Sequence, residues 1–234
     1  MTGAPRTRSA SRSIVRFLAV AAFIGAAPTA LASDVFAHPA TADQLLNGVL
    51  AQPAKLIANT QVIRGEFVFR RFLAELPAPL ESTGRYVFAR GLGIDWHTEA
   101  PLDSESIVTA TGTMQRDDGA VTMQADASAQ PALRTASRIL TSLLTLDVHA
   151  LDSTFDLFGD GADGRWEIGL KPSGAAVAAI VREATVAGGE QVERVTLHDA
   201  NGDRTEITFR HVTYDAAAPS EQERARFETT RTKQ

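Results

Sequence analysis

Hydrophobic and polar side chains alternate along most of the chain after residue 61, which is the pattern of strands that bury one face. Short turns such as Asp117-Asp118-Gly119 and Asn201-Gly202-Asp203 separate these runs. Connections this short join antiparallel neighbours, so the pattern predicts a β meander. The predicted strands cover residues 62–73, 80–89, 94–97, 105–111, 113–116, 120–124, 155–158, 165–170, 181–187, 191–198 and 204–212.

Two segments change from alternation to helical spacing. Residues 42–57 carry apolar side chains every three or four positions after Thr41, a suitable N-cap, with Gly48 and Pro53 as weak points inside the helix. Residues 131–146 repeat the spacing and interrupt the strands. The fold class expected is therefore α+β, mainly β, with few helices available to cover an apolar sheet face.

The N-terminal segment has the features of an export signal. Arginines precede a short apolar run, 17–27, and small residues end the segment at Ala32, with Ala37 as a second candidate cleavage site. The run is shorter than the roughly 20 residues that a spanning helix needs, so we expect cleavage rather than a membrane anchor. The predicted organisation is a signal peptide at 1–32, a spacer at 33–41, one domain at 42–215, and a polar tail at 216–234 with about one helical turn.

Removal of that signal changes the charge of the protein. The whole chain has a net charge of −5, but four arginines and no acidic residue lie in 1–32, which leaves 19 basic against 28 acidic residues, or −9. Such a charge argues against nucleic acid and anionic lipid surfaces as partners. The absence of cysteine excludes disulfides, thiol catalysis and a lipidated N-terminal cysteine. We expect an exported, periplasmic monomer without a membrane anchor.

A set of motifs is spread over most of residues 42–213. It consists of Phe67, Gly84, the run Phe88-Ala89-Arg90-Gly91-Leu92-Gly93-Ile94-Asp95-Trp96, Ala100-Pro101, Ile107-Val108-Thr109, Gly112 and the hairpin around Asn201-Gly202-Asp203. This set resembles the outer-membrane lipoprotein carriers of the LolA type. Two departures indicate a divergent branch, because Phe67-Val68-Phe69 replaces the family's Phe-x-Gln and Arg90-Gly91 replaces its Arg-Pro.

The resemblance implies an incomplete, open antiparallel β-barrel whose helices form a lid over an apolar cavity for lipoprotein acyl chains. It places Arg90 at the family's strand arginine, which contacts the lid and controls its opening, and Trp96 at the family's strand tryptophan. It also implies an inner-membrane ABC transporter and an outer-membrane acceptor as partners. In a divergent branch, the cargo could be another lipid.

The residues themselves support two interpretations of this site. Arg90 is a candidate latch, because a guanidinium can bind carbonyls at a helix end, but it could equally solvate the rim of the sheet. The apolar candidates could line a lipid cavity or form an ordinary core. They are Phe67, Phe69, Phe88, Ile94, Trp96, Leu140, Leu143 and Leu144.

No catalytic or metal-binding signature stands out, so we expect no enzyme activity, cofactor or metal. Asp95, His97 and Glu99 share one face of a strand and are interpreted as a solvated edge. The acidic residues of 156–167 do not match a calcium loop. Two alternatives to a carrier stay open: a periplasmic regulator that senses lipid or lipoprotein, and an accessory protein of glycolipid or lipid export.

Overall fold

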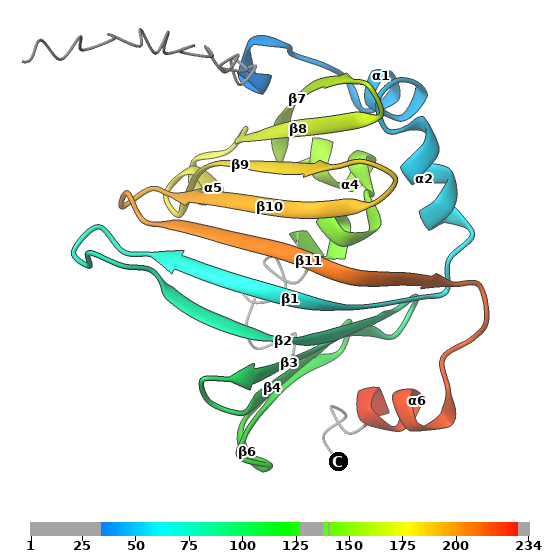
Figure 1. Cartoon of the computed structure of the whole chain (residues 1–234), viewed down its shortest axis with the longest axis vertical. Helices are drawn as coiled ribbons and strands as arrows, with labels where there is room; N and C mark the ends of the chain where they lie inside the picture. The colour runs from blue at the N-terminus through cyan, green and yellow to red at the C-terminus, as the bar shows by residue number, and fades with distance from the viewer. Residues whose placement is uncertain (1–33, 127–137, 140, 229–234) are drawn as a thin grey trace, which may run out of the picture. The chain divides into compact units, whose positions relative to one another are not determined.

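The computed structural model describes residues 34–126, 138–139 and 141–228, all of which belong to one compact unit, 33–234. Its main feature is a single antiparallel sheet of eleven strands in the order β6-β5-β4-β3-β2-β1-β11-β10-β9-β8-β7 (Figure 1). The strands are β1 Val62–Phe72, β2 Leu80–Ala89, β3 Gly93–Ala100, β4 Ser104–Thr109, β5 Gly112–Asp117, β6 Ala120–Asp126, β7 Phe155–Ala162, β8 Arg165–Pro172, β9 Val181–Gly188, β10 Val192–Asp199 and β11 Arg204–Asp215.

The sheet does not close, because β6 and β7 stand at its two ends and are not paired with each other. The prediction of a mainly β, open antiparallel fold is therefore confirmed. All eleven strands were predicted, although β3 and β7 run to Ala100 and Ala162, three and four residues beyond their predicted ends. Within the described residues, none of the helices has the length and apolar character needed to cross a membrane.

The predicted helix at 42–57 is two helices, α1 Ala42–Asn47 and α2 Ala51–Ala58. Thr41 caps α1 in a capping box: its Oγ1 accepts a hydrogen bond from the Gln44 backbone N–H at 3.2 Å, and the Gln44 side chain accepts one from the Thr41 backbone N–H at 2.8 Å. The chain leaves the helix at Gly48, where an added Cβ would lie 2.7 Å from the Gln44 carbonyl oxygen. The break therefore falls at the weak point that the sequence indicates.

The described residues form further short helical segments. They are the 3₁₀ turn η1 Val35–Ala37, residues 138–139 and 141–145, α4 Val148–Asp152, α5 Ala175–Ala178 and α6 Glu221–Glu228. In Figure 1, α1 and α2 lie along the right-hand ends of the strands, and α4 lies behind them. The first part of the predicted helix at 131–146 falls outside the described residues.

One face of the sheet, here the inner face, carries the main hydrophobic core. Buried side chains of α1, α2, α4 and residues 143–146 pack against aromatic and aliphatic residues from both halves of the sheet. At its centre the Phe67 and Trp96 rings stack at 3.9 Å between centroids, and Phe209 meets Tyr86 edge to face at 5.3 Å. A Cβ on Gly84 would lie 2.9 Å from the Phe67 ring, so this glycine makes room for the stack.

The opposite, outer face carries a small second core. Phe227 of α6 is buried there with Ala89, Ile107 and Met114, and α6 packs on β3 and β4. The tail expected to be polar, with about one helical turn, thus contains an eight-residue helix that covers part of the sheet. This helix was missed because its sequence, EQERARFE, has no amphipathic period.

Candidate functional site

Arg90 follows the last residue of β2 and binds the C-terminal end of α2. Its Nε donates to the carbonyl oxygen of Thr60 at 2.8 Å, and its Nη2 donates to that of Ile57 at 2.7 Å. The backbone N–H of Arg90 also donates to the Gln61 carbonyl oxygen at 2.8 Å. The last carbonyls of a helix lack partners within the helix and carry partial negative charge, so a guanidinium is well suited to this position.

A groove of about 510 Å³ lies beside Arg90. It runs between α2, the end of β2 and the helical residues 141–145. Its wall is mainly apolar, with two charged side chains, Arg90 and Asp147. The lining residues are Leu46, Ala54, Ile57, Ala58, Phe88, Arg90, Gly91, Thr141, Thr145, Leu146 and Asp147.

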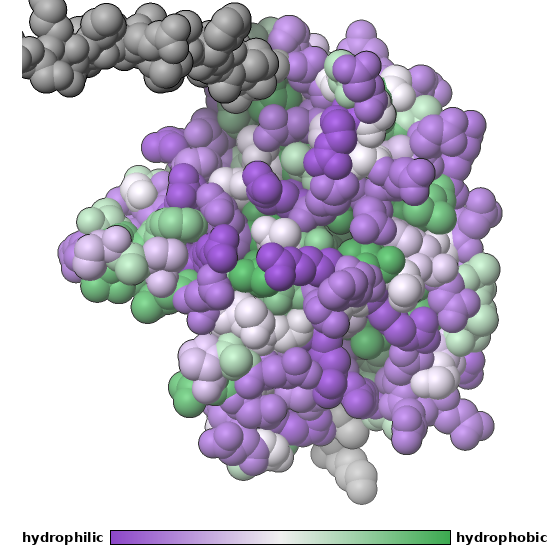
Figure 2. Space-filling view, viewed as in Figure 1, coloured by the Kyte–Doolittle hydropathy of each residue, from purple (hydrophilic) through white to green (hydrophobic). Residues whose placement is uncertain are grey.

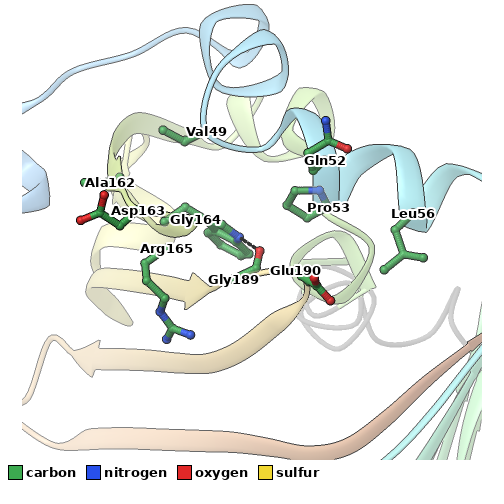
Figure 3. Close-up of a pocket in the computed structure, with 12 residues that line it drawn as sticks. Val49, Gln52, Pro53, Leu56, Ala162, Asp163, Gly164, Arg165, Gly189 and Glu190 are labelled. Carbon is green, nitrogen blue, oxygen red and sulfur yellow. Dashed lines mark hydrogen bonds between the residues drawn. The ribbon is translucent and has the colours of Figure 1, made fainter.

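A second groove, of about 600 Å³, also borders α2 (Figure 3). The β7–β8 and β9–β10 turns form its other side, and the Trp166 indole N–H donates to the Gly189 carbonyl oxygen at 2.6 Å. Arg165 points away from α2 in Figure 3 and forms a bidentate pair with Glu193, with both distances 2.7 Å. Only Pro53 and Ile57 of α2 are buried, so few side chains of this helix pack into the core. The helix lies between the two grooves.

The structure brings together the apolar residues that the sequence nominates. Phe67, Phe88, Ile94, Leu143 and Leu144 are buried in the main core. Phe69 and Trp96 are partly buried and pack against the same core. Leu140 lies outside the described residues. In this structure the other candidate side chains belong to or pack against a single core, and Phe88 also lines the groove beside Arg90.

Other aromatic residues share the inner face and were not nominated. Tyr86, Trp166 and Phe209 are buried in the same core, and Tyr214 packs against it. Burial raises the pKa of Tyr214 to about 12 and raises that of Tyr86 further, because the phenolate loses solvation. The burial of Tyr86 could have been predicted from the sequence, because Tyr86 lies at alternate positions with Gly84 and Phe88 along β2. Phe209 and Trp166 come from strands far away in the chain.

The interpretation of Asp95 as a solvated residue is wrong. Its side chain is 3% exposed because α6 covers it, and Oδ2 accepts a hydrogen bond from Arg226 at 2.9 Å. Its Oδ1 is buried without a hydrogen-bond partner, and burial raises the pKa of this carboxyl. His97, two residues on, instead contacts Asp103 at 2.8 Å. Within the part of the chain that the structure describes, no group of three His, Asp or Glu side chains is placed to hold a metal ion.

These features define a class of protein: an open antiparallel sheet whose apolar inner face is covered by short helices, with a strand arginine bound to a helix end. A family model described as outer membrane lipoprotein carrier protein LolA-like matches residues 39–228. The chain belongs to this LolA-like family.

The solved structures that this chain matches are distant in sequence. A LolA superfamily protein from Nitrosomonas europaea is 8% identical, with a TM-score of 0.41 over 77% of this chain and 96% of that one. LprF from Mycobacterium bovis is 12% identical, with a TM-score of 0.36 over 78% of this chain and 98% of that one. Comparison with curated proteins gave no match.

Proposed function

We propose that this protein is a periplasmic carrier that shelters the acyl chains of a lipoprotein, or of another lipid, against the inner face of its sheet. It takes the cargo from an inner-membrane transporter and passes it to an outer-membrane acceptor. The observation that carries the proposal is the contact of Arg90 with Ile57 and Thr60, which holds a lightly packed helix over an apolar face. Family membership supports it.

The contacts of Arg90 favour a reversible lid. Moving α2 away breaks two hydrogen bonds to backbone carbonyls and uncovers apolar side chains such as Phe88 and Leu46. These two partly buried hydrogen bonds from the guanidinium contribute at least about 2 kcal/mol together. Burying an acyl chain of about 14 carbons gains on the order of 10 kcal/mol. The latch therefore lowers the net affinity for lipid without abolishing it, which is what delivery requires.

The direct test is lipid mass spectrometry of the protein purified from periplasm. We expect co-purified acylated material in roughly stoichiometric amount, because the inner face and the grooves beside α2 are largely apolar. Its chemical class would separate a lipoprotein carrier from an accessory protein of glycolipid export. Protein free of lipid, with no affinity for added acyl chains, would overturn the carrier proposal.

We further propose that export cleaves the chain after Ala32. Val35 is 3% exposed in the folded unit, and Phe36 meets Phe158 edge to face at 5.4 Å. Cleavage after Ala37 would remove both side chains. N-terminal sequencing of the mature protein is expected to begin at Ser33, and a mature chain beginning at His38 would refute this assignment.

A further inference from the structure

Large hydrophobic side chains are exposed mainly at one end of the sheet. Of the six that the described residues expose, Val121 lies on the edge strand β6, beside the β5–β6 turn, and Leu56 lies on α2, next to the end of the sheet that Arg90 closes. Four others lie in or beside loops at the opposite end, which we name the leucine rim. They are Leu76, Leu80, Leu102 and Ile180.

Hydrogen bonds and strand pairing join these loops into one continuous edge. Ile180 accepts a backbone hydrogen bond from Ala200 in the β10–β11 turn at 2.8 Å. That turn reaches the β1–β2 loop, where the Ala74 N–H donates to Asp203 at 3.3 Å. The pairing of Thr83 with Ala100 then brings β2 next to the β3–β4 turn that carries Leu102. The four residues therefore share one end of the sheet although they come from separate segments.

The rim residues project outward, and none of them lines either of the two grooves beside α2. Leu102 is 76% exposed and Ile180 is 66% exposed, so most of each side chain meets solvent and not the core. Figure 2 shows hydrophobic side chains gathered over the loops at the left-hand end of the sheet. Separate apolar side chains that project from loops suit a soft, apolar phase better than a rigid protein partner, which needs complementary shape.

The charged residues near the leucine rim also restrict which kind of surface the rim can bind. Each of four arginines near the rim already forms an ion pair with a carboxylate, so they offer little attraction to an anionic surface. The pairs are Arg70–Glu81, Arg71–Asp199 with Asp203, Arg182–Glu183 and Arg204–Glu206. Contact at the rim therefore depends on apolar burial and not on basic residues.

We propose that the leucine rim rests in the interfacial layer of a zwitterionic lipid bilayer while the protein takes up or delivers its cargo. This inference rests on the proposed carrier function and names the surface that meets the membrane. Burial of a few leucine-sized side chains yields weak, reversible binding, as an exchanging carrier requires. Because no free basic patch is involved, binding should change little with salt.

The test is flotation of the purified full-length mature protein with vesicles of phosphatidylethanolamine and phosphatidylcholine. The variant Leu102→Asp with Ile180→Asp is compared with the wild type and with Ala216→Asp with Ala218→Asp, a charge-matched control in the exposed loop between β11 and α6, at the other end of the sheet. We expect each rim substitution to lower the partition coefficient about tenfold, through the loss of apolar burial. The control should bind like the wild type, and binding should be similar at about 0.1 M and about 1 M salt.

Three outcomes would overturn the rim proposal: no vesicle binding by the wild type, equal binding by the double variant, or a concentration-dependent dimer that the double variant abolishes. The last result would assign the rim to a second copy of the chain. Circular dichroism checks that the variants fold. Lipid mass spectrometry separates the two proposals, because wild-type protein with bound acyl chains but no vesicle affinity would refute the rim alone, and vesicle binding without acyl chains would refute the carrier.

Discussion

Replacing Arg90 by leucine is expected to make the protein bind acyl chains more tightly and deliver them more slowly. The substitution removes the two hydrogen bonds that hold α2 closed at Ile57 and Thr60. Losing about 2 kcal/mol from the closed state shifts the lid equilibrium about 30-fold toward opening. Lipid binding then no longer has to offset that cost, so the apparent affinity rises by up to the same factor.

The measurement is transfer of a fluorescent acyl lipid from loaded protein to acceptor vesicles, together with the amount of lipid that co-purifies. Arg85→Leu is the matched control, because Arg85 lies on β2, the strand that leads to Arg90, but pairs with Glu99 at 2.8 Å, away from α2. Arg90→Lys should be intermediate, since an ammonium group does not reproduce the fork that reaches both carbonyls. If Arg90→Leu and Arg85→Leu transfer lipid alike, Arg90 is not a latch.

Replacing Arg226 by alanine is expected to lower the free energy of unfolding by about 3 kcal/mol at neutral pH. Asp95 would then be a buried carboxylate without its cationic partner. Its Oδ1 already lacks a hydrogen bond, so neither carboxylate oxygen would keep the partner shown here. Asp95→Asn should cost less, because it removes the buried charge while leaving Arg226 half exposed to water. Adding Asp95→Asn to Arg226→Ala should therefore restore part of the lost stability. Chemical denaturation of the four proteins measures these differences.

The pH dependence follows from the raised pKa of Asp95. A carboxyl whose pKa is higher in the folded state than its ordinary value of 3.8 binds protons more tightly when folded. Its destabilising effect is thus full above the folded pKa and fades as the pH falls through that value. The deficit of Arg226→Ala should shrink at acidic pH. A deficit that is unchanged or larger there, or a double variant no more stable than Arg226→Ala, would contradict the buried-charge explanation.

Glu223 also makes the free energy of unfolding depend on pH, in the direction opposite to that of Asp95. Its carboxylate forms a bidentate pair with Arg64, at 2.7 and 3.0 Å, which lowers its pKa to about 2. A lowered pKa stabilises the folded state above the ordinary value of 4.5, and that contribution is lost as the pH falls toward 2. Comparisons between variants at each pH cancel this effect, because all four proteins retain Glu223.

Much of the fold could be predicted from local patterns. Alternation along the chain identified every strand, and Gly48 marked the break between α1 and α2. The sequence did not predict which face of a strand is buried when the helix that covers it is distant in the sequence. Asp95 was interpreted as solvated because nothing near it in the chain indicates that α6 covers it. That helix has one buried aromatic residue, Phe227, and is held mainly by ionic contacts that propensity does not encode.

The sequence by itself determined the strands, the antiparallel pairing of strands that short turns join, and the identity of the arginine after β2, because these depend on periodicity, turn residues and family motifs that are local. The pairing of β1 with β11, which puts β6 and β7 at opposite ends of the sheet, was not predicted. Only the tertiary structure decided which carbonyls Arg90 binds, that the aromatic residues pack into one inner core, and that the C-terminal segment covers the outer face. Those features depend on contacts between distant segments, whose distance and burial no local pattern specifies. The residue types of the candidate site could be predicted from the sequence, but their geometry arises only when the sheet brings distant strands together.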